Sequence, residues 1–181
     1  QEMKIVGFMM RSDMRTCSNT QYLIKKAFKR MWLVRRLKGF GASQGQLIDA
    51  LQKQVLSVLW LGAPAWYCQT TEQERKDIDR VAKVGLRIIF GESYCGFESC
   101  LLAANMLRPT EQLSNMTSRF AAKSASHTKF SQWFEPAANQ TINTRSSKNI
   151  QKYRTVPART ARYGKSPIPY LTRILSNKTH K

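Results

Sequence analysis

Six cations fall within twelve consecutive residues of this sequence and form its most chemically distinctive cluster. They are Lys25, Lys26, Lys29, Arg30, Arg35 and Arg36, with no acid among them. In a helix, like charges four residues apart repel each other, whereas a phosphate backbone would neutralise them and release its counterions. A solvated surface face is the alternative interpretation, but the missing acids favour a face that binds a polyanion.

Groups suited to catalysis are scarce by comparison. Asp77 and Asp79 stand two residues apart on a predicted helix, so they point to different faces and are not placed to share a metal ion. The sequence contains neither a glycine-rich phosphate loop nor a Ser/His/Asp or Cys/His set. The chain by itself is therefore predicted to be a binding module with no catalytic residues and no cofactor.

The four cysteines do not suggest a metal site either. No two of them form a Cys-x-x-Cys pair, and only His127 and His180 could join them as ligands. A disulfide framework is not expected in a chain with this much apolar material. We therefore expect reduced thiols in an intracellular protein, nuclear or cytoplasmic or both.

The overall charge points to the same class of partner as the basic cluster. The chain has 181 residues, and its 30 Lys and Arg against 11 Asp and Glu give a formal net charge of +19. Such an excess attracts polyanions, either nucleic acid or an anionic membrane. Because no run of about 18 apolar residues occurs, a membrane partner is not expected. Nucleic acid is the expected partner.

The basic cluster lies on a helix predicted over residues 20–37 and ended by Gly39 and Gly41. Its apolar stripe consists of Ile24, Ala27, Phe28, Met31 and Val34. Two further helices, in residues 47–91, form an antiparallel hairpin around which the rest should pack.

Local signals mark the ends of these two central helices. Ser43 and Gln46 form a capping-box pattern, as do Thr71 and Glu74. Pro64 is expected to end the first helix shortly before it.

The remaining segments complete a mainly α fold. Residues 4–10 are predicted to form one strand, or one half of a hairpin, and Thr110 is predicted to cap a later helix. After Glu135 the chain is basic and poor in large aliphatics, which predicts a disordered tail that adds little to the core. Within it, residues 166–175 should form an extended lead-in and then a short helix. The expected organisation is a strand and loop over residues 1–19, a helical bundle over 20–134 and the basic tail over 135–181.

Five segments carry a resemblance to a known family. They are KIVGF (residues 4–8), KKAFKRMWLVRRLKGFG (25–41), VLSVLWLGAPAWYC (55–68), IDRVAKVGLRIIFGESYCGFESCLLAANMLRPTEQ (78–112) and FAAKSASHTKFSQWFEP (120–136). In this order they resemble the C-terminal part of the reverse transcriptase of non-LTR retrotransposons, of the jockey-like type. The tail, RTARYGKSPIPYLTRIL (159–175), resembles the arginine-rich end of these proteins. The match covers nearly the whole chain. Departures include Asp79, Ala82 and Phe97, where the family prefers Glu, Gln and Tyr.

The resemblance implies a thumb-like bundle that lays the basic helix along a template–primer duplex, an RNA–DNA hybrid included, and contacts its backbone. It also implies primer-grip-like positions in the N-terminal strand, namely Lys4, Val6, Gly7 and Phe8. The fingers and most of the palm are not in this sequence, so the catalytic aspartates and their Mg²⁺ would belong to those parts, which are candidate partners.

The implied function is that of a nucleic-acid-binding thumb fragment of an RNA-directed DNA polymerase, inactive alone and part of something longer. One alternative is a stand-alone basic helical module that binds RNA, DNA or protein. Another is a translated remnant that folds poorly.

Overall fold

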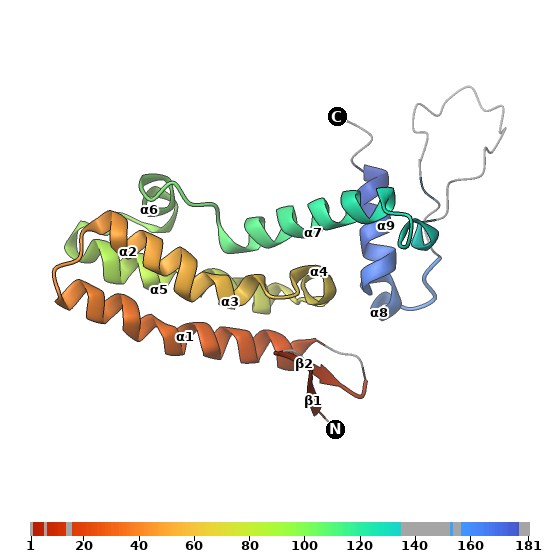
Figure 1. Ribbon diagram of the computed structural model, residues 1–181, viewed down its shortest axis with the longest axis horizontal. Helices are drawn as coiled ribbons and strands as arrows, with labels where there is room; N and C mark the ends of the chain where they lie inside the picture. The colour runs from red at the N-terminus through yellow and green to blue at the C-terminus, as the bar shows by residue number, and fades with distance from the viewer. Residues whose placement is uncertain (1, 6, 14–15, 135–152, 154–156, 178–181) are drawn as a thin grey trace.

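The structure is a computed structural model that describes residues 2–5, 7–13, 16–134, 153 and 157–177. The described chain is mainly helical, as predicted, and it has a short two-stranded sheet near the N-terminus, where one short strand was predicted. Figure 1 shows long helical segments packed together, and a further helix, α7 (Pro109–Ser126), that leads away from them to the helices at the C-terminal end.

The N-terminal segment is a hairpin of β1 (Glu2–Ile5) and β2 (Phe8–Arg11), which pair antiparallel. Residues 4–10 were predicted to form one strand, or one half of a hairpin. Instead they contain the end of β1, the turn at Gly7 and most of β2, so the prediction of one continuous strand is wrong, although a hairpin is present. Gly7 has a φ of +83°, the left-handed conformation that a tight turn requires. The backbone N–H of Met9 donates to the buried Asn19 Oδ1 at 3.1 Å, so the hairpin is tied to the first helix.

The first helix, α1 (Cys17–Gly39), begins slightly earlier than expected and presents a broad apolar face to the core. After the C-cap Phe40, Gly41 adopts a φ of +79° and the Ala42 N–H donates to the Leu37 carbonyl, which closes the last turn of α1. Of the predicted stripe, Ile24 and Phe28 are only half-buried at its edge. The fully buried apolar residues of α1 are Leu23, Ala27, Met31 and Val34.

A second helical rod packs on α1. It consists of α2 (Gln44–Ala50), the π-helical segment η1 (Leu51–Leu56) and α3 (Ser57–Trp60). The capping box of Ser43 and Gln46 is confirmed, since each side chain accepts the backbone N–H of the other residue. The predicted α-helix is correct in place, but the wide π turn in its middle was not predicted.

A compact turn joins this rod to the next helix. It contains α4 (Ala63–Trp66) and the 3₁₀ segment η2 (Tyr67–Gln69). Pro64 lies in the first turn of α4, where its missing N–H costs nothing, so the first central helix ends before it as predicted. The Trp66 side chain is fully buried, and its indole N–H donates to the Leu61 carbonyl at 2.9 Å.

The helix α5 (Glu72–Phe90) completes the bundle, antiparallel to the rod and parallel to α1 (Figure 1). Its capping box on Thr71 is confirmed. Midway along α5, Gly85 lies against Leu51 of the π segment, and a Cβ placed on this glycine would be 2.4 Å from Leu51 Cδ1. At the far end, the Lys38 ammonium donates to the Ile88 carbonyl at 2.5 Å, which ties together the C-terminal ends of the two parallel helices.

Shorter elements follow, namely η3 (Gly91–Ser93), α6 (Phe97–Ala103), α7 (Pro109–Ser126) and η4 (Ser131–Trp133). The prediction that Thr110 caps a helix is wrong, because α7 begins at Pro109 with Arg108 as its N-cap. Thr110 lies inside the first turn and bonds instead to Asp79 of α5.

The described part of the tail contains α8 (Ala161–Gly164) and α9 (Pro167–Asn177). The short helix expected within residues 166–175 is present, but it begins at Pro167, so the extended lead-in is wrong. The expectation that the tail adds little to the core is also wrong for α9, which packs on α7 and buries Leu171 and Leu175 against Ala121 and Phe134. Residues 135–152, 154–156 and 178–181 lie outside the described part.

Candidate nucleic-acid interface

The exposed side of α1 carries most of the predicted basic cluster. Lys25, Lys29 and Arg36 are exposed and share the face opposite Ala27 and Val34, because they recur at helical spacing. Lys26 is half-buried beside them. The sequence of α1 contains no Asp or Glu, so nothing within the helix offsets these charges.

The structure separates Arg30 from that face. Its Nη1 donates to the carbonyl of Gln54 at 2.9 Å, across the interface between α1 and the π segment. Arg30 therefore joins two helices of the bundle and is only half-exposed. Arg35 lies on the opposite flank of α1 and is exposed. Of the six predicted binding residues, five remain available at the surface and one is a packing contact.

The cations of the α1 face have no carboxylate partners in the described part of the chain. The ion pairs found there join Arg11 with Asp13, Lys53 with Asp49, and Arg108 with both Asp79 and Glu98. An unneutralised row of cations on a rigid helix raises the local potential and attracts an anionic backbone.

Aromatic residues are interleaved with these cations. Trp32 and Phe40 are exposed, and the Arg36 guanidinium carbon lies 5.4 Å from the centre of the Phe40 ring. Tyr22 lies near the other end of the helix, with the Lys26 ammonium 5.9 Å from its ring centre. Hydrogen bonding with the nearby Lys4 lowers the pKa of the Tyr22 hydroxyl.

The four primer-grip-like positions fall into different settings. Lys4 reaches α1, where its ammonium lies 5.2 Å from the centre of the Tyr22 ring and extends the basic face. Gly7 forms the hairpin turn against Leu61, and Phe8 is half-buried against the core, so both are packing residues. Val6 lies outside the described residues.

Sequence reasoning missed a second basic column, on α5. Lys76, Arg80, Lys83 and Arg87 are all exposed, and their spacing of four, three and four residues places them on one face of the helix. This face is turned away from the buried Ile78 and Leu86. The signal was present in the sequence, but the acids on the same helix hid it by bringing the net charge of that segment close to zero.

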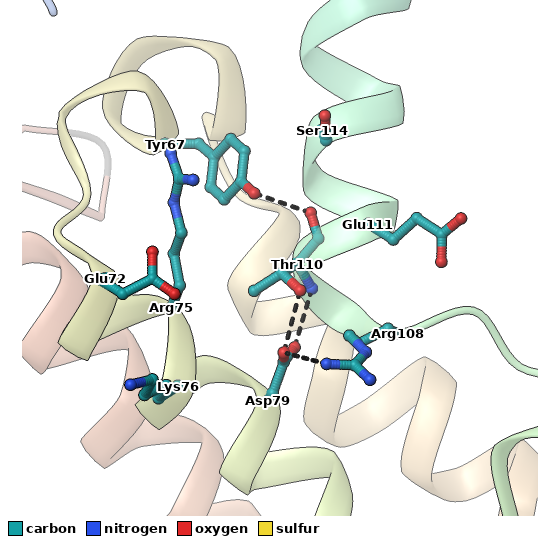
Figure 2. Close-up of a pocket in the computed structure, with 9 residues that line it drawn as sticks. All are labelled: Tyr67, Glu72, Arg75, Lys76, Asp79, Arg108, Thr110, Glu111 and Ser114. Atoms are coloured by element: carbon teal, nitrogen blue, oxygen red, sulfur yellow. Dashed lines mark hydrogen bonds and ion pairs between the residues drawn. The ribbon is translucent and has the colours of Figure 1, made fainter. Parts of the chain in front are cut away.

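A shallow pocket of about 440 Å³ lies beside the N-terminal end of α7 (Figure 2). Asp79 Oδ1 accepts the Thr110 N–H, and Oδ2 accepts the Thr110 hydroxyl, both at 3.0 Å. The Tyr67 hydroxyl donates to the Thr110 carbonyl at 2.9 Å, and Arg108 lies 3.8 Å from Asp79 Oδ2. The carboxylate thus caps α7 from a neighbouring helix. Burial raises the pKa of Asp79, and the Thr110 hydrogen bonds and Arg108 partly offset this rise.

The described residues offer no other chemical centre. Within them, no three His, Cys, Asp or Glu side chains gather in a group that could hold a metal ion. The cysteines are free thiols, and burial raises the pKa of the Cys68 thiol to about 11, so this sulfur is a poor nucleophile. In the part of the chain that the structure covers, no helix has the length and apolar character needed to cross a bilayer.

Comparison with protein-family models, with curated proteins and with solved structures finds no match to this chain.

Proposed function

We propose that this protein binds nucleic acid through the exposed basic face of α1, by contacts to the phosphate backbone. The observation that carries the proposal is the row of unpaired cations on a helix that contains no acid. Such contacts position a nucleic acid without reading its base sequence. The basic column on α5 supports the same function, since α5 packs along α1 and adds four exposed cations of its own.

We further propose that the binding role is that of a thumb-like piece of an RNA-directed DNA polymerase of the non-LTR retrotransposon type. The ordered motif resemblance supports this identity, as does a helical bundle that presents one basic helix. The ligand would be a template–primer duplex, RNA–DNA hybrid included, and catalysis with its Mg²⁺ would reside in the fingers and palm. The free cysteines and the nucleic-acid ligand support an intracellular location, nuclear or cytoplasmic or both.

A salt titration tests the binding site. The test variant replaces four cations of the α1 face with Gln: Lys25, Lys26, Lys29 and Arg36. Each phosphate contact contributes about −0.9 to the slope of log affinity against log salt on B-form DNA, so losing four contacts should flatten the slope by about 3.6. Circular dichroism checks that α1 stays folded, and an RNA–DNA hybrid and a DNA duplex serve as ligands.

A matched control removes the same charge from another part of the molecule. It replaces four exposed cations of α7 and the α8 region with Gln: Arg119, Lys123, Arg159 and Lys165. The proposal expects the α1 variant to lose much more affinity and slope than this control. Equal effects in the two variants would show that total charge, and not the α1 face, holds the ligand, and would refute the proposed site.

A further inference from the structure

The basic face of α1 contains a large aromatic side chain that the fold does not bury. Trp32 is 59% exposed, whereas Trp66 is fully buried in the central core and Trp60 packs partly buried against it. Trp32 follows Lys29 by three residues and precedes Arg36 by four, so it lies on the same side of the helix as both cations. The exposed indole thus lies among cations that could hold a phosphate backbone, where its ring face is accessible to a base.

A second aromatic ring continues the face at its C-terminal end. Phe40 is 76% exposed, directly before the Gly41 turn that ends α1. Its ring is held beside the Arg36 guanidinium, with 5.4 Å between the guanidinium carbon and the ring centre. Trp32, Arg36 and Phe40 are spaced at four-residue intervals, so aromatic and cationic groups alternate along one line of the helix surface.

We propose that Trp32 and Phe40 stack on unpaired bases, so that the α1 face binds single-stranded nucleic acid in addition to the backbone of a duplex. This inference rests on the proposed function, because the flanking cations must first hold the phosphate backbone. In a duplex the base faces are covered by their neighbours, and only the phosphates and groove edges are open to a helix. Unpaired bases expose their faces, and alternating cations and aromatic rings are how sequence-tolerant single-strand binders hold them.

An anionic membrane surface is the other ligand that attracts Trp and Lys together. A helix that lies in the interface plane must insert its apolar face into the lipid. The apolar face of α1 is already committed to the protein core, where Ala27 and Val34 are fully buried. Two separate exposed rings among cations do not supply such a face, so nucleic acid fits this surface better.

The experiment compares a single strand with the duplex of the same sequence, using the full chain at fixed salt. Trp32→Ala should weaken single-strand binding about fivefold to a hundredfold, the range found for loss of one stacking ring, and change duplex binding by less than twofold. Phe40→Ala should act in the same direction, and Trp32→Phe should recover part of the loss because it restores a ring. Trp133→Ala is the control, since Trp133 is partly exposed but packs beside Phe130 away from the α1 face.

The outcomes separate the stacking inference from the proposed function. If the four-cation α1 variant loses binding but Trp32→Ala does not affect single strands selectively, nucleic-acid binding stands and the stacking inference is overturned. If neither variant has an effect, both are overturned. Phosphatidylserine vesicles form a further arm. Binding to them that depends on Trp32 and exceeds binding to the single strand would assign the face to a lipid surface and overturn the inference.

Discussion

The close approach of α5 to the π segment gives the sharpest test of the packing. A Cβ placed on Gly85 would lie 2.4 Å from Leu51 Cδ1 and 2.8 Å from Cδ2, whereas apolar carbons prefer separations of about 3.5–4.0 Å. Leu51 is completely buried, so any shift of its side chain would have to be accommodated within the core. Overpacking of this kind costs about 1–3 kcal/mol, and the contact is short enough to place Gly85→Ala near the upper end.

The helix propensity of alanine works in the opposite direction. Replacing an interior glycine by alanine stabilises a helix by about 1 kcal/mol. We therefore expect Gly85→Ala to lower the free energy of unfolding by about 1–2 kcal/mol, measured by urea denaturation followed by circular dichroism. Gly45→Ala is the matched control, because Gly45 is also helical and a Cβ there would meet nothing within 4 Å. This variant should be as stable as the parent or more so.

A double-mutant cycle shows whether Leu51 is the cause. Leu51→Ala alone should cost about 2–5 kcal/mol through the cavity it leaves. In the Gly85→Ala background the same change should cost less, because the added methyl group enters the vacated space, and a coupling of about 1–3 kcal/mol is expected for residues in direct contact. If Gly85→Ala matched the stability of the parent and the two changes were additive, the close packing described for α5 and the π segment would be refuted.

Three further predictions concern the other contacts that hold the helices together. Asp79→Ala should cost about 1–3 kcal/mol because it leaves the Thr110 N–H without its acceptor. Asp79→Asn keeps an acceptor for this N–H but does not titrate. Because the pKa of Asp79 is raised in the folded state, the parent should lose stability relative to Asp79→Asn as the pH rises from the ordinary pKa of 3.8 through the folded-state pKa. Denaturation of both proteins at several pH values would measure this difference. Lys38→Met should lower the free energy of unfolding by about 0.3–1 kcal/mol, because it removes the cation that contacts the C-terminal end of α5. Lys83→Met, at an exposed position within α5, is the control and should lower it less when both variants are measured by urea denaturation. Leu171→Ala should cost about 2–5 kcal/mol, and hydrogen exchange should show the loss of protection in the second half of α7 and not in α1.

Features encoded by neighbouring residues could be predicted from the sequence. The caps at Ser43 and Thr71 each need only a hydroxyl and a Glu or Gln three residues later, so the pattern determines the geometry. The spacing of apolar residues predicted the positions of α1 and of the central helices, because this spacing is also a local pattern. The hairpin around Gly7 was harder to predict, because strands of four residues show too little alternation of apolar and polar residues to locate the turn between them.

Features that depend on contacts between distant segments could not be predicted. The π turn at Leu51 coincides with the close approach of Gly85, which is 34 residues away in sequence. Asp79 caps a helix that begins 30 residues later, and no local pattern marks this role. For the candidate site, charge alone identified the α1 face. Arg30 could not be separated from its neighbours, because its acceptor is a backbone carbonyl and not a side chain.

The net positive charge of the chain affects the stability of the folded protein as well as its contacts with the proposed ligand. With a net charge of +19, the compact state repels itself, and the described ion pairs neutralise only a few of the cations. A polyanion that binds the folded bundle removes this repulsion and stabilises the fold by mass action. Added salt acts on the two states in opposite ways, because it screens the repulsion in the free protein and weakens the attraction in the complex. Under the proposed function, an anionic backbone bound to the exposed cations of α1 should therefore raise the free energy of unfolding of the bundle.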